Sequence, residues 1–559
     1  MAHRYQHVLM VCPEFPKTYW GLQYSLPLFG RKALMPPLGL LTVAAMIPPA
    51  YEVRVVDLNC QPLTQKDLDW ADMVCFSAMH TQQVSLFETA RRCRTAGKLV
   101  VFGGPFPTLS PEQCRPYCDV LVLNEAEVTW PAFLEDLGRG TYRDVYASDE
   151  KPDVTKVPVP RFDLVNARDY GSMPIQFSRG CPFECEFCDI IVMFGRRPRA
   201  KTPKQFLAEL EAIYATGYRG MIFLVDDNFI GNKKEVKRLL PELQAWNEAH
   251  GRPFVYGTEA SLDLAYDEAL LKQMAACHFK WVFVGIETPS LESLKETRKF
   301  QNMKGSLLDS VKAIQKAGMV VWGGFIVGFD NDGEDIFDRQ IEFITRAAIP
   351  VGHVAILFAL PGTPLYKRLE ETGRLEPIDY DPTAVRSEDM RYIYTNIATI
   401  LPRRQLLEGY GRILDRIYQP SAYFKRSLEA LCQLPRPESL TARIRNLFWL
   451  GTLALKNFTG SRGMGLFGFG AWRFLRDLLG QLPAEYRRES LRFAWQVLRK
   501  CPDHLPYMLL FIITGVHHYR FTFEHTLPDI KMEQERGLPE RTEVAASPSA
   551  GGHLGGGAS

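Results

Sequence analysis

Short runs of apolar and β-branched residues alternate with helix-like stretches through most of the chain before residue 396, and this restricts the fold more than any other feature. The first series of runs occupies residues 8–11, 53–56, 73–76, 99–102 and 120–123. Helix-like stretches such as residues 83–96 separate most of these runs. Such alternation predicts a parallel sheet with helices on both faces. We therefore expect an α/β fold that begins with a Rossmann-like domain over residues 1–150.

A second alternating series follows a proline-rich linker at residues 151–160. Its predicted strands are residues 175–178, 221–225, 255–258, 281–285, 320–326 and 354–358. The clearest predicted helix has Thr202 as its N-cap and Pro203 in its first turn. Six strand–helix units predict a partial (β/α)6 barrel over residues 165–395, with its site at the carboxyl ends of the strands.

The remaining chain lacks strand-like runs. Residues 396–530 are rich in Phe, Leu, Trp and Arg and predict a helical domain, whereas residues 531–559 are mostly small or polar and predict a disordered tail. Spanning a bilayer takes roughly 18 consecutive apolar residues. The longest candidate run, residues 507–516, is shorter than that.

Charge and cysteine usage limit the partners and the compartment. The formal net charge of the 559 residues is +2, which gives no basis for nucleic-acid binding. No signal peptide is recognisable at the N-terminus, and only one group of the twelve cysteines is tightly spaced. We therefore expect a cytoplasmic protein in which this group is a metal or redox site.

The tight group is Cys181, Cys185 and Cys188, placed directly after the first predicted barrel strand. Three thiolates within eight residues can hold three irons of a 4Fe–4S cube and leave the fourth iron open. One alternative is a zinc knuckle, but structural zinc usually takes four protein ligands and the next cysteine is Cys277. A second alternative is three inert buried thiols. We favour the cluster.

With Phe187 before the last cysteine, this C-x3-C-x2-C motif resembles the signature of the radical S-adenosylmethionine (SAM) superfamily. The resemblance implies that the open iron binds SAM and that reduction yields a 5′-deoxyadenosyl radical. Polar residues at the strand ends match the family's SAM contacts loosely, and with Phe187 the expected cofactor-binding residues are Asp226, Asp227, Glu259 and Glu287. The alternative for the two aspartates is a capping pair before a helix, and Glu287 could equally be structural.

The α/β domain before the barrel resembles the cobalamin-binding domain of the cobalamin-dependent subgroup. The matching segments are residues 35–41, 103–105 and 124–127, although Asn124 stands where the family usually has glycine. We expect Ser77, Gly103 and Gly104 to approach cobalamin. The Asp-x-His-x-x-Gly motif that supplies an axial histidine elsewhere is absent from the sequence. His80 could lie near cobalt, but a satisfied loop histidine is the favoured interpretation.

Residues 175–424 resemble the subgroup that contains the hopanoid C-2 methylases, most clearly in residues 188–203, 225–232 and 359–364. The resemblance implies a C-methyltransferase: the adenosyl radical removes a substrate hydrogen, and methylcobalamin, remethylated by a second SAM, supplies the methyl group. It also implies an electron donor, a reductase or a flavodoxin or ferredoxin. The alternatives are a radical oxidoreductase or cyclase with cobalamin as electron carrier, and a non-catalytic sensor.

The expected substrate is a small molecule, and two features bear on its nature. Aromatic and apolar residues interleave with arginines through residues 446–516, a pattern that suits an anionic membrane surface and a lipid-like substrate. We therefore expect peripheral contact with the inner face of the membrane; the alternative is a helical cap whose apolar face packs on the barrel. A second basic cluster, Arg196, Arg197, Arg199 and Lys201, is either a solvated face or a cofactor contact.

Overall fold

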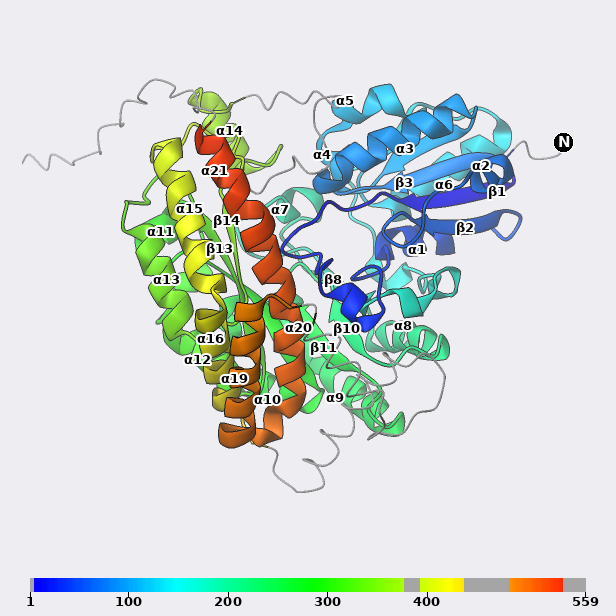
Figure 1. The fold of residues 1–559 in the computed structure, drawn as a ribbon. Coiled ribbons are helices and arrows are strands. Elements are labelled where there is room, and N and C mark those ends of the chain that lie inside the picture. The colour runs from blue at the N-terminus through cyan, green and yellow to red at the C-terminus, as the bar shows by residue number, and fades with distance from the viewer. Residues whose placement is uncertain (1–4, 377–392, 437–479, 481, 536–559) are drawn as a thin grey trace, which may run out of the picture.

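A computed structural model of the chain describes residues 5–376, 393–436, 480 and 482–535 (Figure 1). The N-terminal domain holds one parallel sheet in the order β2-β1-β3-β4-β5-β6. Its strands are β1 (His7–Cys12), β2 (Glu52–Asp57), β3 (Met73–Ser77), β4 (Leu99–Gly103), β5 (Val120–Val122) and β6 (Val145–Tyr146). The five strands expected from the sequence are confirmed. The two-residue β6 is too short to leave a hydrophobic pattern of its own.

Helices cover both faces of this sheet, because its strands are apolar on both sides. The main helices are α1 (Leu38–Ala45), α2 (Gln65–Trp70), α3 (Gln83–Thr95), α4 (Pro105–Leu109), α5 (Pro111–Cys114) and α6 (Ala126–Arg139). Two separate apolar cores result, one on each side of the sheet. This is the Rossmann-like layering that the sequence predicts.

The second sheet is parallel throughout and runs in the order β14-β13-β12-β11-β10-β7. Its strands are β7 (Ser172–Ile175), β10 (Met221–Leu224), β11 (Val255–Glu259), β12 (Phe279–Glu287), β13 (Val320–Val327) and β14 (Gly352–Ile356). Within the described residues β14 and β7 do not pair, so the barrel is open. The predicted partial barrel is confirmed.

The first barrel strand lies earlier than expected. We predict residues 175–178, but β7 ends at Ile175, and Ser178–Arg179 forms β8, which pairs antiparallel with β9 (Arg199–Ala200). The physical reason is a buried carboxylate: Asp226 accepts hydrogen bonds from the backbone amides of Phe177 and Ser178. These amides therefore bond to a side chain instead of continuing the sheet.

The helices outside the barrel alternate with its strands. They include α8 (Pro203–Ala215), α9 (Lys233–Ala249), α10 (Glu268–Ala276), α11 (Leu291–Glu296), α12 (Leu307–Lys316), α13 (Ile336–Arg346) and α14 (Pro364–Glu371). The predicted start of α8 is confirmed: Thr202 accepts a hydrogen bond from the Gln205 amide in a capping box, a device that contributes about 1 kcal/mol. Phe206, Leu210 and Ile213 of this helix are fully buried.

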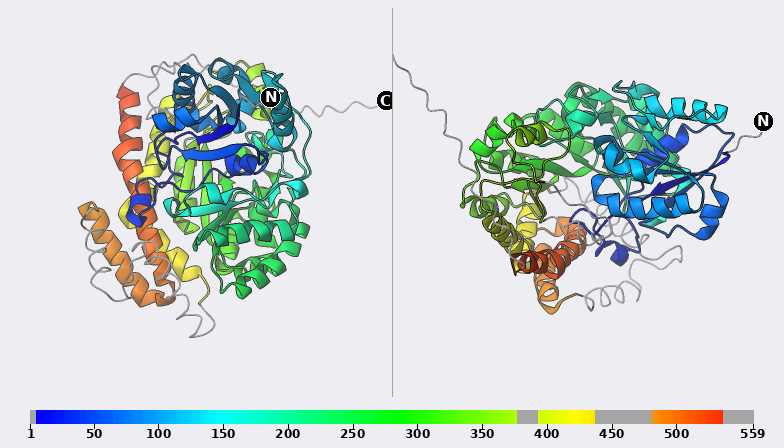
Figure 2. Two further views of the ribbon diagram at one scale, coloured as in Figure 1. Left: turned by 90° about the vertical axis from the view of Figure 1, so that its right-hand side faces the viewer. Right: turned by 90° about the horizontal axis from the view of Figure 1, so that it is seen from above.

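The C-terminal region is helical wherever it is described. It contains α15 (Arg403–Tyr418), α16 (Pro420–Gln433), α19 (Ala484–Lys500), α20 (Leu505–Phe521) and α21 (Leu527–Glu535). These helices form a layer along one side of the barrel (Figure 2), where the Tyr418 hydroxyl donates to the Gly352 carbonyl at the start of β14. α21 continues past the boundary that we place at residue 530; residues 536–559, the rest of the predicted tail, lie outside the described residues.

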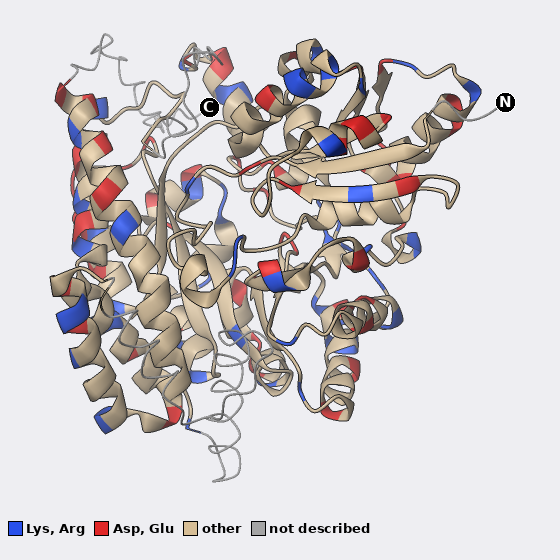
Figure 3. Ribbon diagram, turned by 45° about the vertical axis from the view of Figure 1, so that its right-hand side comes forward, with Lys and Arg blue, Asp and Glu red and all other residues tan. Residues whose placement is uncertain are grey.

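No helix in the described parts of the chain has both the length and the apolar character needed to cross a bilayer. Basic and acidic residues are interspersed along the outer helices (Figure 3), in keeping with the small net charge.

The connection between β1 and α1 joins all three regions. The Ser25 hydroxyl donates to the Ile513 carbonyl at 2.5 Å, and the Tyr19 hydroxyl lies 2.9 Å from the Thr522 hydroxyl. His517 lies 2.7 Å from the Thr18 carbonyl. A segment of the N-terminal domain is therefore held between the open barrel and α20.

Candidate functional site

The loop that carries the three cysteines begins with a tight turn at Gly180. This residue has a φ of +94°, and a Cβ there would lie 2.9 Å from the Gly195 carbonyl oxygen. Only glycine fits this conformation without strain. Asp227, just past the end of β10, accepts a hydrogen bond from the Gly180 amide at 2.7 Å. The start of the loop is thus fixed by the barrel.

Two side-chain amides donate toward the cysteine sulfurs. Gln301 Nε2 lies 3.4 Å from Cys185 Sγ, and Asn228 Nδ2 lies 3.9 Å from Cys181 Sγ. Hydrogen bonds to sulfur stabilise the negative charge of cluster thiolates and tune their potential. Gln301 carries no sequence signal, because it lies in the connection between α11 and α12, far from the cysteines along the chain.

The charges around the cysteines fit thiolates that bind iron. Burial raises the pKa of Cys181 and Cys188, and the neighbouring Cys185 thiol adds to both effects. Burial disfavours the charged form of Lys299, but Glu287 and the nearby cysteines outweigh that effect and raise its pKa. A buried ammonium beside the thiols favours their deprotonated form, which metal binding requires.

The described residues contain no three His, Cys, Asp or Glu side chains that converge on a single metal ion. A zinc knuckle would need such convergence. A 4Fe–4S cube does not, because each thiolate binds an iron of its own.

Asp226 and Asp227 hold the cysteine loop. Asp226 is buried and also accepts from the Ser178 hydroxyl at 2.6 Å, in addition to its two amide bonds. Burial raises the pKa of Asp226 to about 6 and that of Asp227 to about 7. The contacts seen for both aspartates are to the loop, so their expected contact with SAM stays a prediction.

Glu259 at the end of β11 differs from these aspartates. Its carboxylate has no hydrogen bond to any described residue, and burial and the nearby Asp227 and Asp226 raise its pKa to about 7. A carboxylate in this state can accept hydrogen bonds from hydroxyl or amino groups of a ligand. Among the predicted SAM contacts, Glu259 is the best placed to act as one.

Glu287 and Phe187 flank Lys299. Glu287 forms a buried ion pair with Lys299 at 2.6 Å and has a φ of +65° where the register between β12 and β13 shifts. The Phe187 ring lies 5.8 Å from the Lys299 ammonium and packs on Phe329. These contacts support a structural role for Glu287. Its contact with SAM stays a prediction.

Ser77, Gly103 and Gly104 meet at the carboxyl edge of the N-terminal sheet. Gly104 has a φ of +90°, and a Cβ on it would lie 2.4 Å from Ser77 Oγ. A Cβ on Gly103 would lie 3.1 Å from the Val122 carbonyl oxygen. The two glycines allow β3, β4 and β5 to end in close contact and expose backbone at the edge where such sheets bind ligands.

His80 lies between the two domains. Its ring packs against Phe106 of the N-terminal domain and Phe358 of the barrel, and burial lowers its pKa. A cavity of about 420 Å³ opens beside it, lined by residues of both domains that include Ser110, Phe358 and Tyr366.

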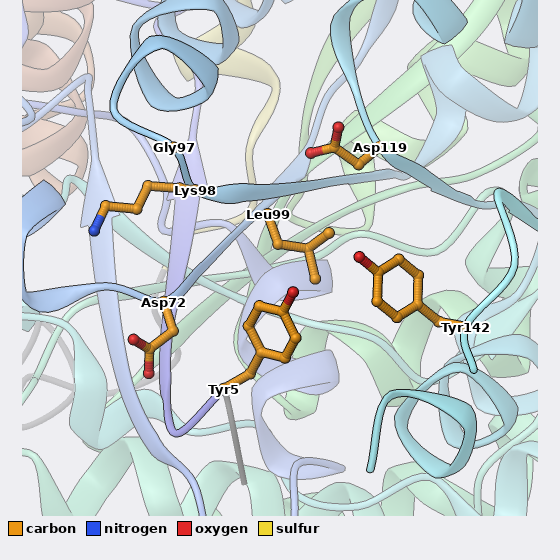
Figure 4. A pocket seen from close by; sticks show the side chains of 7 residues that line it. All are labelled: Tyr5, Asp72, Gly97, Lys98, Leu99, Asp119 and Tyr142. Carbon is orange, nitrogen blue, oxygen red and sulfur yellow. The ribbon is translucent and has the colours of Figure 1, made fainter. Parts of the chain in front are cut away.

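A second cavity, of about 310 Å³, lies at the opposite, amino-terminal end of the N-terminal sheet and is lined by Asp72, Lys98 and Asp119 among others (Figure 4).

Residues 124–127, one of the segments that match the cobalamin-binding domain, contact the cysteine loop. Arg179 donates to Glu125 at 2.9 Å and to Glu127 at 2.7 Å, and Arg199 donates to Glu125 at 2.7 Å. These ion pairs are largely buried. Three of the four residues of the basic cluster pair with carboxylates: Arg199 with Glu125, Lys201 with the buried Glu209, and Arg196 with Glu184.

Known protein families match this arrangement. Residues 175–344 match the radical SAM superfamily, residues 29–134 the B12 binding domain, and residues 363–528 a domain of unknown function. An uncharacterized methyltransferase of Synechocystis is 44% identical over 80% of this chain and 83% of its own length. The hopanoid C-2 methylase of Rhodopseudomonas palustris is 35% identical over 75% of this chain and 78% of its own length.

The chain belongs to the cobalamin-dependent radical SAM methyltransferases. A solved cobalamin-dependent SAM radical enzyme, OxsB, shares the fold, with a TM-score of 0.58 at 15% identity over 96% of this chain and 82% of its own. The cofactors of this methyltransferase are a 4Fe–4S cluster, SAM and cobalamin. Methyltransferase relatives favour methyl transfer over the oxidoreductase, cyclase and sensor alternatives.

Proposed function

We propose that this methyltransferase adds a methyl group to a carbon atom of an apolar, lipid-like small molecule. The observation that carries the proposal is an aromatic lining on the inner face of the open barrel. Trp281 stacks on Phe223 with ring centroids 5.0 Å apart and lies 4.8 Å from Trp322. Phe283, next along β12 on the same face, lies 4.6 Å from Trp20.

Glycines on neighbouring strands make room for these rings. A Cβ on Gly257 would lie 2.1 Å from the Trp281 ring, and a Cβ on Gly324 would lie 2.7 Å from the Phe283 ring. The aromatic side chains can therefore lie flat along the sheet. Such a surface binds hydrocarbon by burial and offers little to a charged substrate.

When bound, the cluster and SAM supply the radical and cobalamin supplies the methyl group. Cys181, Cys185 and Cys188 hold the cluster, with Lys299 as a nearby positive charge. We assign contact with SAM to Glu259, and contact with cobalamin to Ser77, Gly103 and Gly104 at the carboxyl edge of the N-terminal sheet. A flavodoxin, ferredoxin or dedicated reductase is the proposed electron donor.

The test is anaerobic reconstitution with iron, sulfide, cobalamin, SAM and a reductant, followed by mass analysis after incubation with a bacterial lipid extract. The proposal expects one lipid species to gain a methyl group while 5′-deoxyadenosine and S-adenosylhomocysteine form. Methylation confined to the water-soluble fraction of the same extract would contradict a lipid-like substrate.

We also propose that α19 rests on an anionic membrane surface. Leu491, Trp495 and Leu498 are each at least half exposed and share one side of the helix, spaced by four and three residues. Exposed arginines, Arg488 and Arg492, flank them. Apolar anchors beside basic residues suit lipid headgroups. Phe493 of the same helix is buried and does not contribute to this surface. The other aromatic and apolar residues that suggest membrane contact lie outside the described residues: Phe448, Trp449, Leu450, Phe467, Phe469, Trp472 and Phe474.

Flotation with anionic liposomes at low salt tests this contact. The intact protein should float, and Trp495→Glu combined with Leu491→Glu should reduce flotation severalfold. Leu291→Glu on α11, another exposed leucine, is the matched control and should float like the unaltered protein. If the unaltered protein stays with the soluble fraction, the membrane contact is wrong.

A further inference from the structure

Two buried histidines face each other at the inner wall of the barrel. His353 lies on β14 and His518 on α20, and their ring centroids are 5.6 Å apart at an interplanar angle of 66°. Both side chains are more than nine-tenths buried. They come from different regions of the chain, so no sequence motif joins them.

These histidines have unused ring nitrogens. Neither nitrogen of His353 has a hydrogen-bond partner among the described residues, and Nε2 of His518 has none either. The adjacent His517 shows the usual situation: one nitrogen accepts from the Tyr24 amide and the other faces the Thr18 carbonyl. A buried polar atom without a partner is costly and calls for a bound group.

The aromatic lining surrounds this pair. Trp20 stacks flat on His353 with centroids 4.0 Å apart, and the rings of Phe283 and Trp322 lie about as close to His353 as His518 does, at 6.0 Å and 6.2 Å. Trp20 is 40% exposed, so the stack borders solvent. The unpaired nitrogens are therefore buried polar atoms directly behind an apolar, aromatic lining.

The donor and acceptor roles can be assigned. Nδ1 of His518 lies 2.9 Å from the Thr514 carbonyl, which can only accept, so Nδ1 carries the proton. Burial lowers the pKa of His518 to about 4 and also lowers that of His353, so both rings are neutral near pH 7. Nε2 of His518 is then an acceptor, whereas neutral His353 offers one donor and one acceptor.

We propose that His353 and His518 bind a hydroxyl group of the substrate and thereby fix the position of its hydrocarbon body against the aromatic lining. A hydroxyl can donate to His518 Nε2 and accept from His353 in one position. A carbonyl can accept from His353 but leaves His518 unpaired. This inference rests on the proposed lipid-like substrate and narrows it to a neutral alcohol.

The test compares three small probes of one shape: decahydronaphthalen-2-ol, the corresponding ketone and decalin. Binding to the reconstituted holoenzyme is measured by anaerobic titration calorimetry. We expect the alcohol to bind about tenfold tighter than decalin, with the ketone between them, as one or two net hydrogen bonds would give. His353→Phe and His518→Phe keep the aromatic packing and should each reduce the preference for the alcohol while decalin binding stays the same.

His250→Phe on the outer surface of the barrel, where the ring packs on Trp246, is the matched control and should keep the full preference. Circular dichroism and thermal unfolding establish that each variant folds. Equal binding of all three probes, as expected if the histidines hold only a buried water, overturns the inference and leaves the lipid-like substrate standing. An alcohol preference that survives in both histidine variants also overturns it. Absence of binding by every probe would contradict the apolar substrate itself.

Discussion

Arg179, the second residue before Cys181, donates a hydrogen bond to Glu125 of the N-terminal domain at 2.9 Å. The same guanidinium reaches Glu127, and its Nε donates to Gln176 at the end of β7. One side chain therefore connects the segment that resembles a cobalamin contact with the loop that carries the cluster. This buried ion pair sets the position of one cofactor domain relative to the other.

Replacing Arg179 by Gln should lower the free energy of unfolding of the apoprotein by about 3 kcal/mol, because it removes the cation of Glu127 and leaves the buried Glu125 with Arg199 alone. Arg196→Gln removes an exposed pair with Glu184 and should cost less than about 1 kcal/mol. Urea denaturation followed by circular dichroism measures both. If the two variants lose the same free energy of unfolding, the buried pair stabilises the protein no more than the exposed pair does.

Replacing Cys181, Cys185 and Cys188 together by Ala should abolish iron binding and SAM cleavage, because the cluster loses all its protein ligands. Cys277→Ala is the control: its thiol is buried and donates to the Leu240 carbonyl, away from the loop. Iron content and 5′-deoxyadenosine formation after anaerobic reconstitution are the measurements. Retained SAM cleavage in the triple variant would refute the cluster assignment.

The raised pKa of Glu259 predicts a pH dependence of stability. Its value in the fold is about 7, above the ordinary 4.5, so the folded protein holds a proton that the unfolded chain releases between these values. The stability that the folded protein gains by keeping this proton is therefore present below pH 4.5 and is lost as the pH rises toward 7. Glu259→Gln should therefore stabilise the apoprotein at pH 8 by about 2 kcal/mol and weaken SAM binding. If Glu259→Gln leaves the SAM affinity unchanged, Glu259 does not belong to the SAM site.

Gly104→Ala should weaken cobalamin binding and lower the free energy of unfolding by about 2–3 kcal/mol, since it adds both backbone strain and a clash with Ser77. Gly97→Ala is matched to it: Gly97 also has a positive φ, but a Cβ there meets no atom within 4 Å. Gly97→Ala should lower the free energy of unfolding by only about 1 kcal/mol and leave cobalamin binding intact. Absorbance titration with cobalamin distinguishes the two.

Bound cob(II)alamin should show no nitrogen hyperfine splitting from an axial ligand in electron paramagnetic resonance. The sequence lacks the motif for such a histidine, and the His80 ring packs between Phe106 and Phe358. His80→Ala should leave the spectrum unchanged. A histidine signal that disappears in this variant would show that His80 binds cobalt.

The sheets and the cluster loop could be predicted from the sequence because local patterns determine them. Strand and helix periodicities are set by neighbouring residues, and three cysteines within eight positions remain close in any fold. The end of β7 could not be predicted, since it depends on Asp226, which lies 48 residues after Ser178. The contact between Trp20, His353 and His518 could not be predicted either. These residues come from three regions of the chain, and no local sequence pattern links them.

The segment after β1 has a consequence for how the protein forms on the ribosome. Each of Thr18, Tyr19 and Ser25 forms a hydrogen bond with a residue that is made 488 to 503 residues later. Synthesis proceeds at roughly 5–20 residues per second, so this early segment waits on the order of a minute for its partners. During that interval Trp20 and Tyr19 are exposed to other chains. Slower translation or a shortage of chaperones should therefore reduce the yield of this protein through residues 18–25, although the sheet of their own domain is made long before α20.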